Sequence, residues 1–230
     1  MSYLPIIFPS DPHLRRWMLF VDGENLTIRA QELAKKNKIS LIEGDYYRRD
    51  TFIWFPKVRA TEKFFGVMTT IYPPLQYEET IHSPKTSPTE TFINISNSPA
   101  KVQAQAIRSY YYTSVVGDSN KIKAIRTSLW NIGFHPEIFK KDRKNTKAKG
   151  VDIALSKDLL VNAFYNNYDV AVLIAGDGDY IPLVQEVKRL GKIVCTAFFN
   201  NMGLNEELKL SSDWFFDLED AFIKRWQSNE

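Results

Sequence analysis

The sequence is poor in the residues that build disulfides and zinc sites. Its 230 residues include one cysteine, Cys195, and only three histidines. A single cysteine can form neither an intramolecular disulfide nor a cysteine zinc cluster, so Cys195, inside the apolar run 193–197, is expected to be a buried core residue. His13, His82 and His135 lack the spacing of a zinc site or of a Ser-His-Asp triad, which argues against both kinds of hydrolase.

The chain also lacks a strong charge bias and any long hydrophobic run. Thirty basic residues against 27 acidic ones leave a net charge of +3, so any basic footprint for nucleic acid must be local. No run approaches the roughly 20 apolar residues that span a bilayer, and residues 1–11 lack the pattern of a signal peptide. We therefore expect a cytoplasmic protein without a membrane partner. Glycine-rich loops of NTPases and dinucleotide enzymes are missing as well.

What the sequence does contain is an alternation of short apolar runs with amphipathic segments. Residues 17–21 form a continuous apolar run that ends at Asp22, which is typical of a buried parallel strand. A helix should follow, because apolar residues recur at helical spacing at Leu26, Ala30, Leu33 and Ala34.

The same alternation returns in the second half of the chain. Strands are predicted at 110–116, 135–139, 170–174 and 193–198, with helices at 120–132, at 151–165 and between Pro182 and Gly191. The 151–165 helix is apolar on most sides and is expected to be largely buried, and residues 214–226 should form an edge strand or a closing helix. This order predicts an α/β fold, a three-layer α/β/α sandwich with a mainly parallel sheet.

Residues 44–100 interrupt this rhythm and are interpreted as an insertion. They carry six of the eleven prolines, yet too many apolar residues for a solvated linker. The segment could be a lid, a surface for a second copy or a protein partner, or simply extra core. The domain would then consist of residues 1–43 and 101–230, with the insertion between them.

Aspartates stand at three predicted strand-to-helix junctions. Asp22 follows one strand, Asp177 and Asp179 follow another, and Asp152 begins the 151–165 helix, so all should meet at the carboxyl edge of the sheet. Each alone could be a turn former or a helix cap. Together they favour a cation site, because clustered carboxylates repel one another and oxygen ligands prefer Mg²⁺ or Mn²⁺.

Three motifs resemble those of a known family. They are Asp-Gly-Glu-Asn at 22–25, Lys-Gly-Val-Asp at 149–152 and Gly-Asp-Gly-Asp-Tyr at 176–180. They resemble the NYN domain of the PIN-like nuclease superfamily, especially its LabA-like (DUF88) branch, over residues 17–38 and 109–218. Two features depart from the family pattern: Ala175 stands where Ser or Thr is common, and the 44–100 insertion has no counterpart.

The resemblance implies a PIN-like sheet whose acidic residues bind Mg²⁺ or Mn²⁺ and hydrolyse RNA phosphodiester bonds. The matching positions are Asp22, Asn25, Asp152, Asp177 and Asp179. In that interpretation the four aspartates are catalytic and metal-binding residues. Asp22, Asp152 and Asp177 hold an ion that activates a water for in-line attack, and Asp179 binds a second ion or orients the water. Asn25 would support them by hydrogen bonding.

A basic segment leads directly into Asp152. Residues 140–149 contain six basic side chains, which would attract the phosphate backbone of single-stranded RNA, although such a run can also be a solvated loop. The candidate RNA-binding residues are Lys141, Arg143, Lys144, Lys147 and Lys149. Tyrosines 110–112 could stack on bases, but a strand favours core positions for them.

The leading hypothesis is therefore a Mg²⁺- or Mn²⁺-dependent endoribonuclease. One alternative is a catalytically weak RNA-binding or regulatory module of the same fold. Another is a phosphatase or related phosphoryl-transfer enzyme, which the absence of an Asp-x-Asp motif disfavours, since Asp22 is followed by Gly23 and Glu24.

Overall fold

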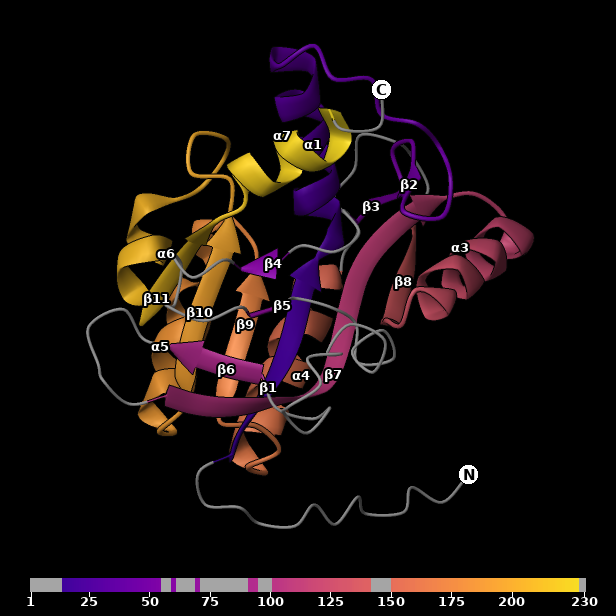
Figure 1. Ribbon diagram of the computed structural model, residues 1–230. Helices are drawn as coiled ribbons and strands as arrows, with labels where there is room; N and C mark the ends of the chain where they lie inside the picture. Colours follow the sequence, from indigo (N-terminus) through magenta and orange to yellow (C-terminus); the bar gives the residue numbers. More distant parts are fainter. Residues whose placement is uncertain are drawn as a thin grey trace, which may run out of the picture.

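A seven-stranded sheet forms the centre of the molecule (Figure 1). The computed structural model describes residues 14–54, 59–60, 69–70, 91–94, 101–141 and 150–227. The sheet consists of β1 (Leu14–Asp22), β6 (Thr91–Asn94), β7 (Lys101–Val116), β8 (His135–Lys141), β9 (Val170–Ile174), β10 (Ile193–Phe198) and β11 (Trp214–Asp217). The order is β11-β10-β9-β1-β7, and both β8 and β6 pair with β7. Six strands run parallel, and β6 is antiparallel to β7.

Helices follow most of the parallel strands. They are α1 (Gly23–Lys36), α3 (Ser119–Asn131), α4 (Val151–Phe164), α5 (Ile181–Arg189), α6 (Glu206–Ser211) and α7 (Glu219–Gln227), with a 3₁₀ turn, η2 (Gly178–Tyr180), before α5. Two short antiparallel pairs complete the described elements: β2 (Tyr47–Arg48) with β3 (Phe52–Ile53), and β4 (Arg59–Ala60) with β5 (Thr69–Thr70).

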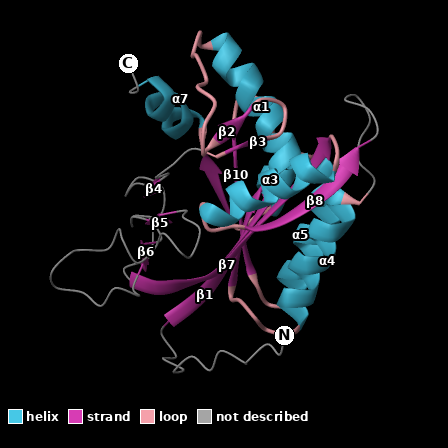
Figure 2. Cartoon of the chain, turned by 90° about the vertical axis from the view of Figure 1, so that its right-hand side faces the viewer, coloured by secondary structure: helices cyan, strands magenta, loops and turns pink. Residues whose placement is uncertain are grey.

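The central strand β1 divides the core into two layers. Successive side chains of a strand point to opposite faces, so Trp17, Leu19 and Val21 pack with α1, α3 and α7, whereas Met18 and Phe20 pack with α4, α5 and α6. In Figure 2, α4 and α5 lie side by side on their face of the sheet. The predicted three-layer α/β/α sandwich is confirmed, including both a final strand and a closing helix.

The helix α4 is less buried than its composition predicts. Leu155 and Leu159 are buried, but Ile153 is 72% exposed and Phe164 is 71% exposed. The expectation of a largely buried helix was wrong on this side, because α4 meets the sheet and α5 with one face only.

The first part of the predicted insertion belongs to the main core. Tyr47, Phe52, Ile53 and Trp54 are buried beneath α1 and β7, and the Tyr111 hydroxyl donates a hydrogen bond of 2.9 Å to the carbonyl of Ile53. Further along the chain, β6 extends the sheet through β7. Residues 47–54 thus act as extra core, while most of 55–100 lies outside the described residues.

Cys195 and two of the tyrosines of β7 also follow the predictions. Cys195 is buried and unpaired, and Tyr111 and Tyr112 are core residues of β7. In the portion of the chain that the structure describes, no helix combines the length and the apolar composition needed to cross a membrane.

We predict that Gly23→Ala destabilises the fold. An added Cβ would lie 1.9 Å from Cε1 of the buried Tyr111 ring, which hydrogen bonds to Ile53 and has little room to move. Overpacking of this kind costs about 1–3 kcal/mol, which urea denaturation would measure. Gly44→Ala is the matched control, because nothing lies within 4 Å of its Cβ position. Equal unfolding midpoints for the two variants would contradict the close contact.

Candidate functional site

The order in which strands are added to the sheet reverses beside β1, and this reversal determines where the site lies. The chain runs from β1 outward through β7 to β8, and then crosses to β9 on the other side of β1. Ligands of open parallel sheets bind at such a switch point, beyond the carboxyl ends of the strands. Here the two strands that flank the switch point are β1, which ends at Asp22, and β9, which leads through Ala175 and Gly176 to Asp177.

Asp22 is a buried carboxylate at the start of α1. It is 4% exposed, and its Oδ1 accepts a hydrogen bond of 3.0 Å from the backbone N–H of Asn25, which makes it the N-cap of the helix. Burial raises the pKa of Asp22 from 3.8 to about 6; the bonds from Asn25 and Tyr180 oppose this rise, and the charges of Asp152 and Glu24 add to it. An ionised Asp22 is therefore costly unless a positive charge joins it.

The hydroxyl of Tyr180 joins two of the predicted aspartates. It lies 3.0 Å from Oδ2 of Asp22 and 3.2 Å from Oδ1 of Asp152, which stands in the first turn of α4. A phenol has one proton and cannot donate it fully to two acceptors. When both carboxylates are ionised, the group of three therefore carries two negative charges and has one hydrogen-bond donor for two acceptors, which favours the binding of a proton or a cation.

The loop after β9 is fixed to α1 and to the neighbouring strand. The side-chain oxygen of Asn25 accepts a hydrogen bond of 3.3 Å from the N–H of Gly176, and the Asp177 carboxylate accepts one of 3.1 Å from the N–H of Asp179. A Cβ at Gly176 would lie 2.4 Å from the Phe198 ring, so the glycine allows the loop to pack this closely. These contacts hold Asp177 at the cavity.

Glu24 adds a fourth carboxylate, which already has a cationic partner. The Lys141 ammonium, at the end of β8, forms a salt bridge with it, and the Ser114 hydroxyl donates a hydrogen bond of 2.5 Å. The Lys141 side chain is only 9% exposed. Glu24 is therefore neutralised by the protein itself, in contrast to Asp22.

These groups surround a cavity of about 120 Å³. Its lining consists of Asp22, Glu24, Asn25, Ile28, Val151, Asp152 and Asp177. Of the residues predicted from the sequence, the structure thus brings together three aspartates and Asn25. Asp179 is exposed and does not line the cavity. Lys141 lies beside the cavity, whereas the predicted Arg143, Lys144, Lys147 and Lys149 fall outside the described residues.

The chemistry of the lining suits a hard divalent cation, but the side chains are not gathered around one point. All the polar side chains that line the cavity offer oxygen donors, and neither histidine nor cysteine is among them. Within the described ranges, however, no three Asp, Glu, His or Cys side chains are close enough to hold one ion. The buried Asp22 and the shared Tyr180 proton are the features that fit a cation.

Two important residues were not singled out from the sequence. Tyr180 and Glu24 both lie inside the quoted motifs, but an acid in the first turn of a helix is also an ordinary helix-start residue, and the sequence does not show where the Tyr180 side chain points. The bridging role of Tyr180 depends on η2, which turns the side chain back toward β1 and buries it to 2% exposure. Their position in the motifs was the available signal.

The fold and site define an α/β/α domain with an acidic cavity at the switch point of a parallel sheet, and comparison with known proteins agrees. The model of the NYN domain family matches residues 79–219, more than half of the chain. This chain belongs to the NYN domain family, a member of the PIN-like nuclease superfamily, which points to nuclease activity. The matched segment begins after Asp22, but β1 lies between β7 and β9 of the same sheet.

The other comparisons add the fold alone. No curated protein matches the chain. The crystal structure of a protein of unknown function from Vibrio parahaemolyticus is similar over 93% of this chain and 98% of that chain, with a TM-score of 0.51 and 17% sequence identity.

We predict that Asp22→Asn stabilises the protein at neutral pH. Burial raises the pKa of Asp22 from 3.8 to about 6, so the folded protein binds more protons than the unfolded chain between these values. The free energy of unfolding therefore falls as the pH rises through this window, by up to about 3 kcal/mol, and stays low above it. Asparagine keeps the helix cap without the charge.

Urea denaturation from pH 3.5 to 8 without divalent ions, with Asp220→Asn as a control, measures this effect. The Asp220 side chain is 89% exposed, so that variant should follow the wild type. An Asp22→Asn variant that is less stable than the wild type at pH 7 would contradict the cost assigned to Asp22.

Proposed function

We propose that this protein is a metal-dependent ribonuclease that hydrolyses phosphodiester bonds within single-stranded RNA. The observation that carries the proposal is the convergence of Asp22 and Asp152 on the single proton of Tyr180, at the edge of an acidic cavity. Membership of the NYN family supports nuclease chemistry, and NYN nucleases act on RNA. We also retain the LabA-like branch as our hypothesis for its place within the family.

Asp22, Asp152 and Asp177 are the residues we expect to hold Mg²⁺ or Mn²⁺. Such an ion, when bound, polarises a phosphate and lowers the pKa of a water molecule. Asp22 contributes a carboxylate whose ionisation a cation would favour, since burial raises its pKa to about 6. Tyr180 orients Asp22 and Asp152 through its hydroxyl, which makes it a positioning residue.

The neighbouring residues position the site and the substrate. Asn25 fixes the loop that carries Asp177 through its bond to Gly176. Asp179, exposed beside Asp177, is proposed to bind a second ion or to orient the attacking water. The basic residues of 140–149 precede Asp152 in the sequence, and we propose that they attract the RNA backbone toward the cavity.

A second candidate function is an RNA-binding or regulatory module with weak catalysis. Two observations favour it: the protein neutralises Glu24 with its own Lys141, and in the described parts of the chain no three acidic side chains converge on one point. In that case the acidic cavity would have no catalytic role, and RNA would bind without being cleaved.

We predict that Asp177→Asn lowers RNA cleavage at least about a hundredfold, since a metal-activated nucleophile is worth several kcal/mol. Asparagine still caps η2, so the fold should remain. The measurement is cleavage of a labelled single-stranded RNA with Mn²⁺ or Mg²⁺ and with chelator, and Asp220→Asn again provides the control.

Three results separate the candidates. Cleavage that requires the ion and is lost in Asp177→Asn supports the ribonuclease. Equal cleavage by Asp177→Asn and the wild type contradicts the proposed site. Tight RNA binding by the wild type without cleavage under any of these ions selects the regulatory module.

A further inference from the structure

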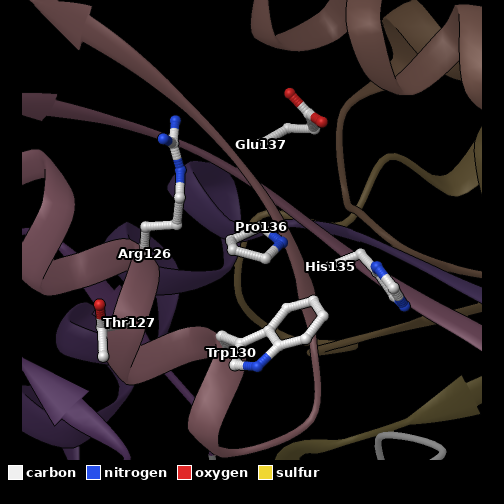
Figure 3. A pocket seen from close by; sticks show the side chains of 6 residues that line it. All are labelled: Arg126, Thr127, Trp130, His135, Pro136 and Glu137. Atoms are coloured by element: carbon white, nitrogen blue, oxygen red, sulfur yellow. The ribbon is translucent and has the colours of Figure 1, made fainter. Parts of the chain in front are cut away.

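A second and larger cavity lies between α3 and β8, away from the acidic site. It has a volume of about 400 Å³ and is lined by Arg126, Thr127, Trp130, His135, Pro136 and Glu137. Figure 3 shows Arg126, Thr127 and Trp130 on one side, from α3, and the other three residues on the strand β8. Pockets that bind small molecules have volumes of about 300–1,000 Å³, so this one is large enough for a nucleotide unit.

The walls of this cavity are aromatic and well supported. The indole of Trp130 is perpendicular to the His135 ring, at 87°, with 5.5 Å between their centroids. His135 in turn contacts Tyr110, which stacks on the core residue Phe20. The residue Trp130 is nevertheless 53% exposed, so a flat aromatic surface held by rigid neighbours faces solvent.

The polar groups of the cavity suit a nucleobase and its phosphate. Within the described part of the chain, the Arg126 guanidinium has no salt-bridge or hydrogen-bond partner. Burial and the nearby Arg108 lower the pKa of His135, so its neutral ring has both a donor and an acceptor nitrogen. Glu137 offers acceptor oxygens for the exocyclic amine of a base.

The electrostatic character of α3 points to an anionic ligand. The helix contains Lys121, Lys123 and Arg126 but neither Asp nor Glu. Its N-cap, Asp118, is the nearest acid in its own segment, and Glu137 is the acid of β8. A stacking surface beside an unbalanced positive helix is the combination that binds single-stranded nucleic acid.

The strand β8 connects this cavity with the acidic site. It begins at His135 and ends at Lys141, whose ammonium reaches Glu24 at the acidic cavity. Its seven residues, at about 3.3 Å each, span about 20 Å. In the part of the chain that the structure describes, β8 pairs only with β7, so its other edge has no strand partner there.

We infer that the cavity between α3 and β8 is a nucleobase subsite, in which a base of single-stranded RNA stacks on Trp130 while Arg126 contacts its phosphate. This inference rests on the proposed function for the identity of the ligand as RNA. The subsite would hold a nucleotide several positions away from the phosphate in the acidic cavity, and so would favour substrates long enough to reach both.

The test is binding of a fluorescein-labelled single-stranded RNA of about twelve nucleotides to the full chain in EDTA, where no cleavage occurs. Trp130→Ala should weaken binding by about tenfold, as expected for loss of one stacking interaction, and Trp130→Phe should restore most of it. Tyr165→Ala is the matched control, because it removes an aromatic residue that is 68% exposed on the far end of α4. Arg126→Ala provides a second variant that leaves the aromatic contacts intact.

Tryptophan fluorescence gives an independent measurement of RNA binding at this cavity. Trp17, Trp54 and Trp226 are buried, and Trp214 lies on β11 at the opposite edge of the sheet. Quenching by RNA in the wild type should therefore arise mainly at Trp130 and disappear in Trp130→Phe. A second comparison uses cleavage of a short dinucleotide substrate, which cannot reach this cavity and should be unaffected by Trp130→Ala.

The outcomes distinguish this inference from the proposed function. If the wild type cleaves RNA but Trp130→Ala and Arg126→Ala bind the long RNA as the wild type does, the subsite is refuted and the nuclease stands. If both variants weaken binding while no ion supports cleavage, the subsite stands and the nuclease is refuted. Quenching that persists in Trp130→Phe also refutes the subsite.

Discussion

The hydroxyl of Tyr180, shared between Asp22 and Asp152, is the contact on which the site depends. It joins three segments that are distant in sequence: the end of β1, the start of α4 and the turn η2 after β9. Each segment reaches this point because β1 and β9 are neighbours in a parallel sheet and α4 begins at the same edge. The single proton between two carboxylates leaves a deficit of positive charge that the fold does not correct.

The surrounding contacts show how the protein tolerates that deficit. Glu24 is balanced by Lys141, and the Asp177 carboxylate accepts a backbone N–H. Asp22, in contrast, is nearly enclosed, and two hydrogen bonds offset only part of the cost of its burial. Ionisable groups with strongly shifted pKa values cluster at sites that bind or transform ligands. The cost of burying Asp22 is therefore consistent with the activity expected of an NYN domain.

Much of the arrangement followed from the sequence. The continuous apolar runs before Asp22 and before Asp177 predicted two buried parallel strands. The carboxyl ends of parallel strands lie at the same edge of the sheet. With Asp152 expected at a helix start on the same edge, Asp22 and Asp177 were predicted to lie together, while Asn25 was assigned to the site by the resemblance to the NYN domain. The role of Tyr180 could not, since it depends on how one tight turn orients a side chain. Nor could the pairing of Glu24 with Lys141, which requires the register of β8 against β7.

The exposed side of α4 and the cavity beside α3 illustrate a related limit. Periodicity identifies apolar residues, but it does not reveal which of them a neighbouring element covers. Phe164 was expected to be a core residue but is exposed. Trp130 lies on an amphipathic helix, and its position next to His135 became visible only in the structure.

The titration of the Asp22 carboxyl carbon by NMR tests the central claim most directly. Without divalent ions its pKa should be about 6, and added Mg²⁺ should lower the apparent pKa because the cation competes with the proton for the same carboxylate. A pKa near 3.8 that does not respond to Mg²⁺ would contradict the account of a buried carboxylate that requires a positive partner.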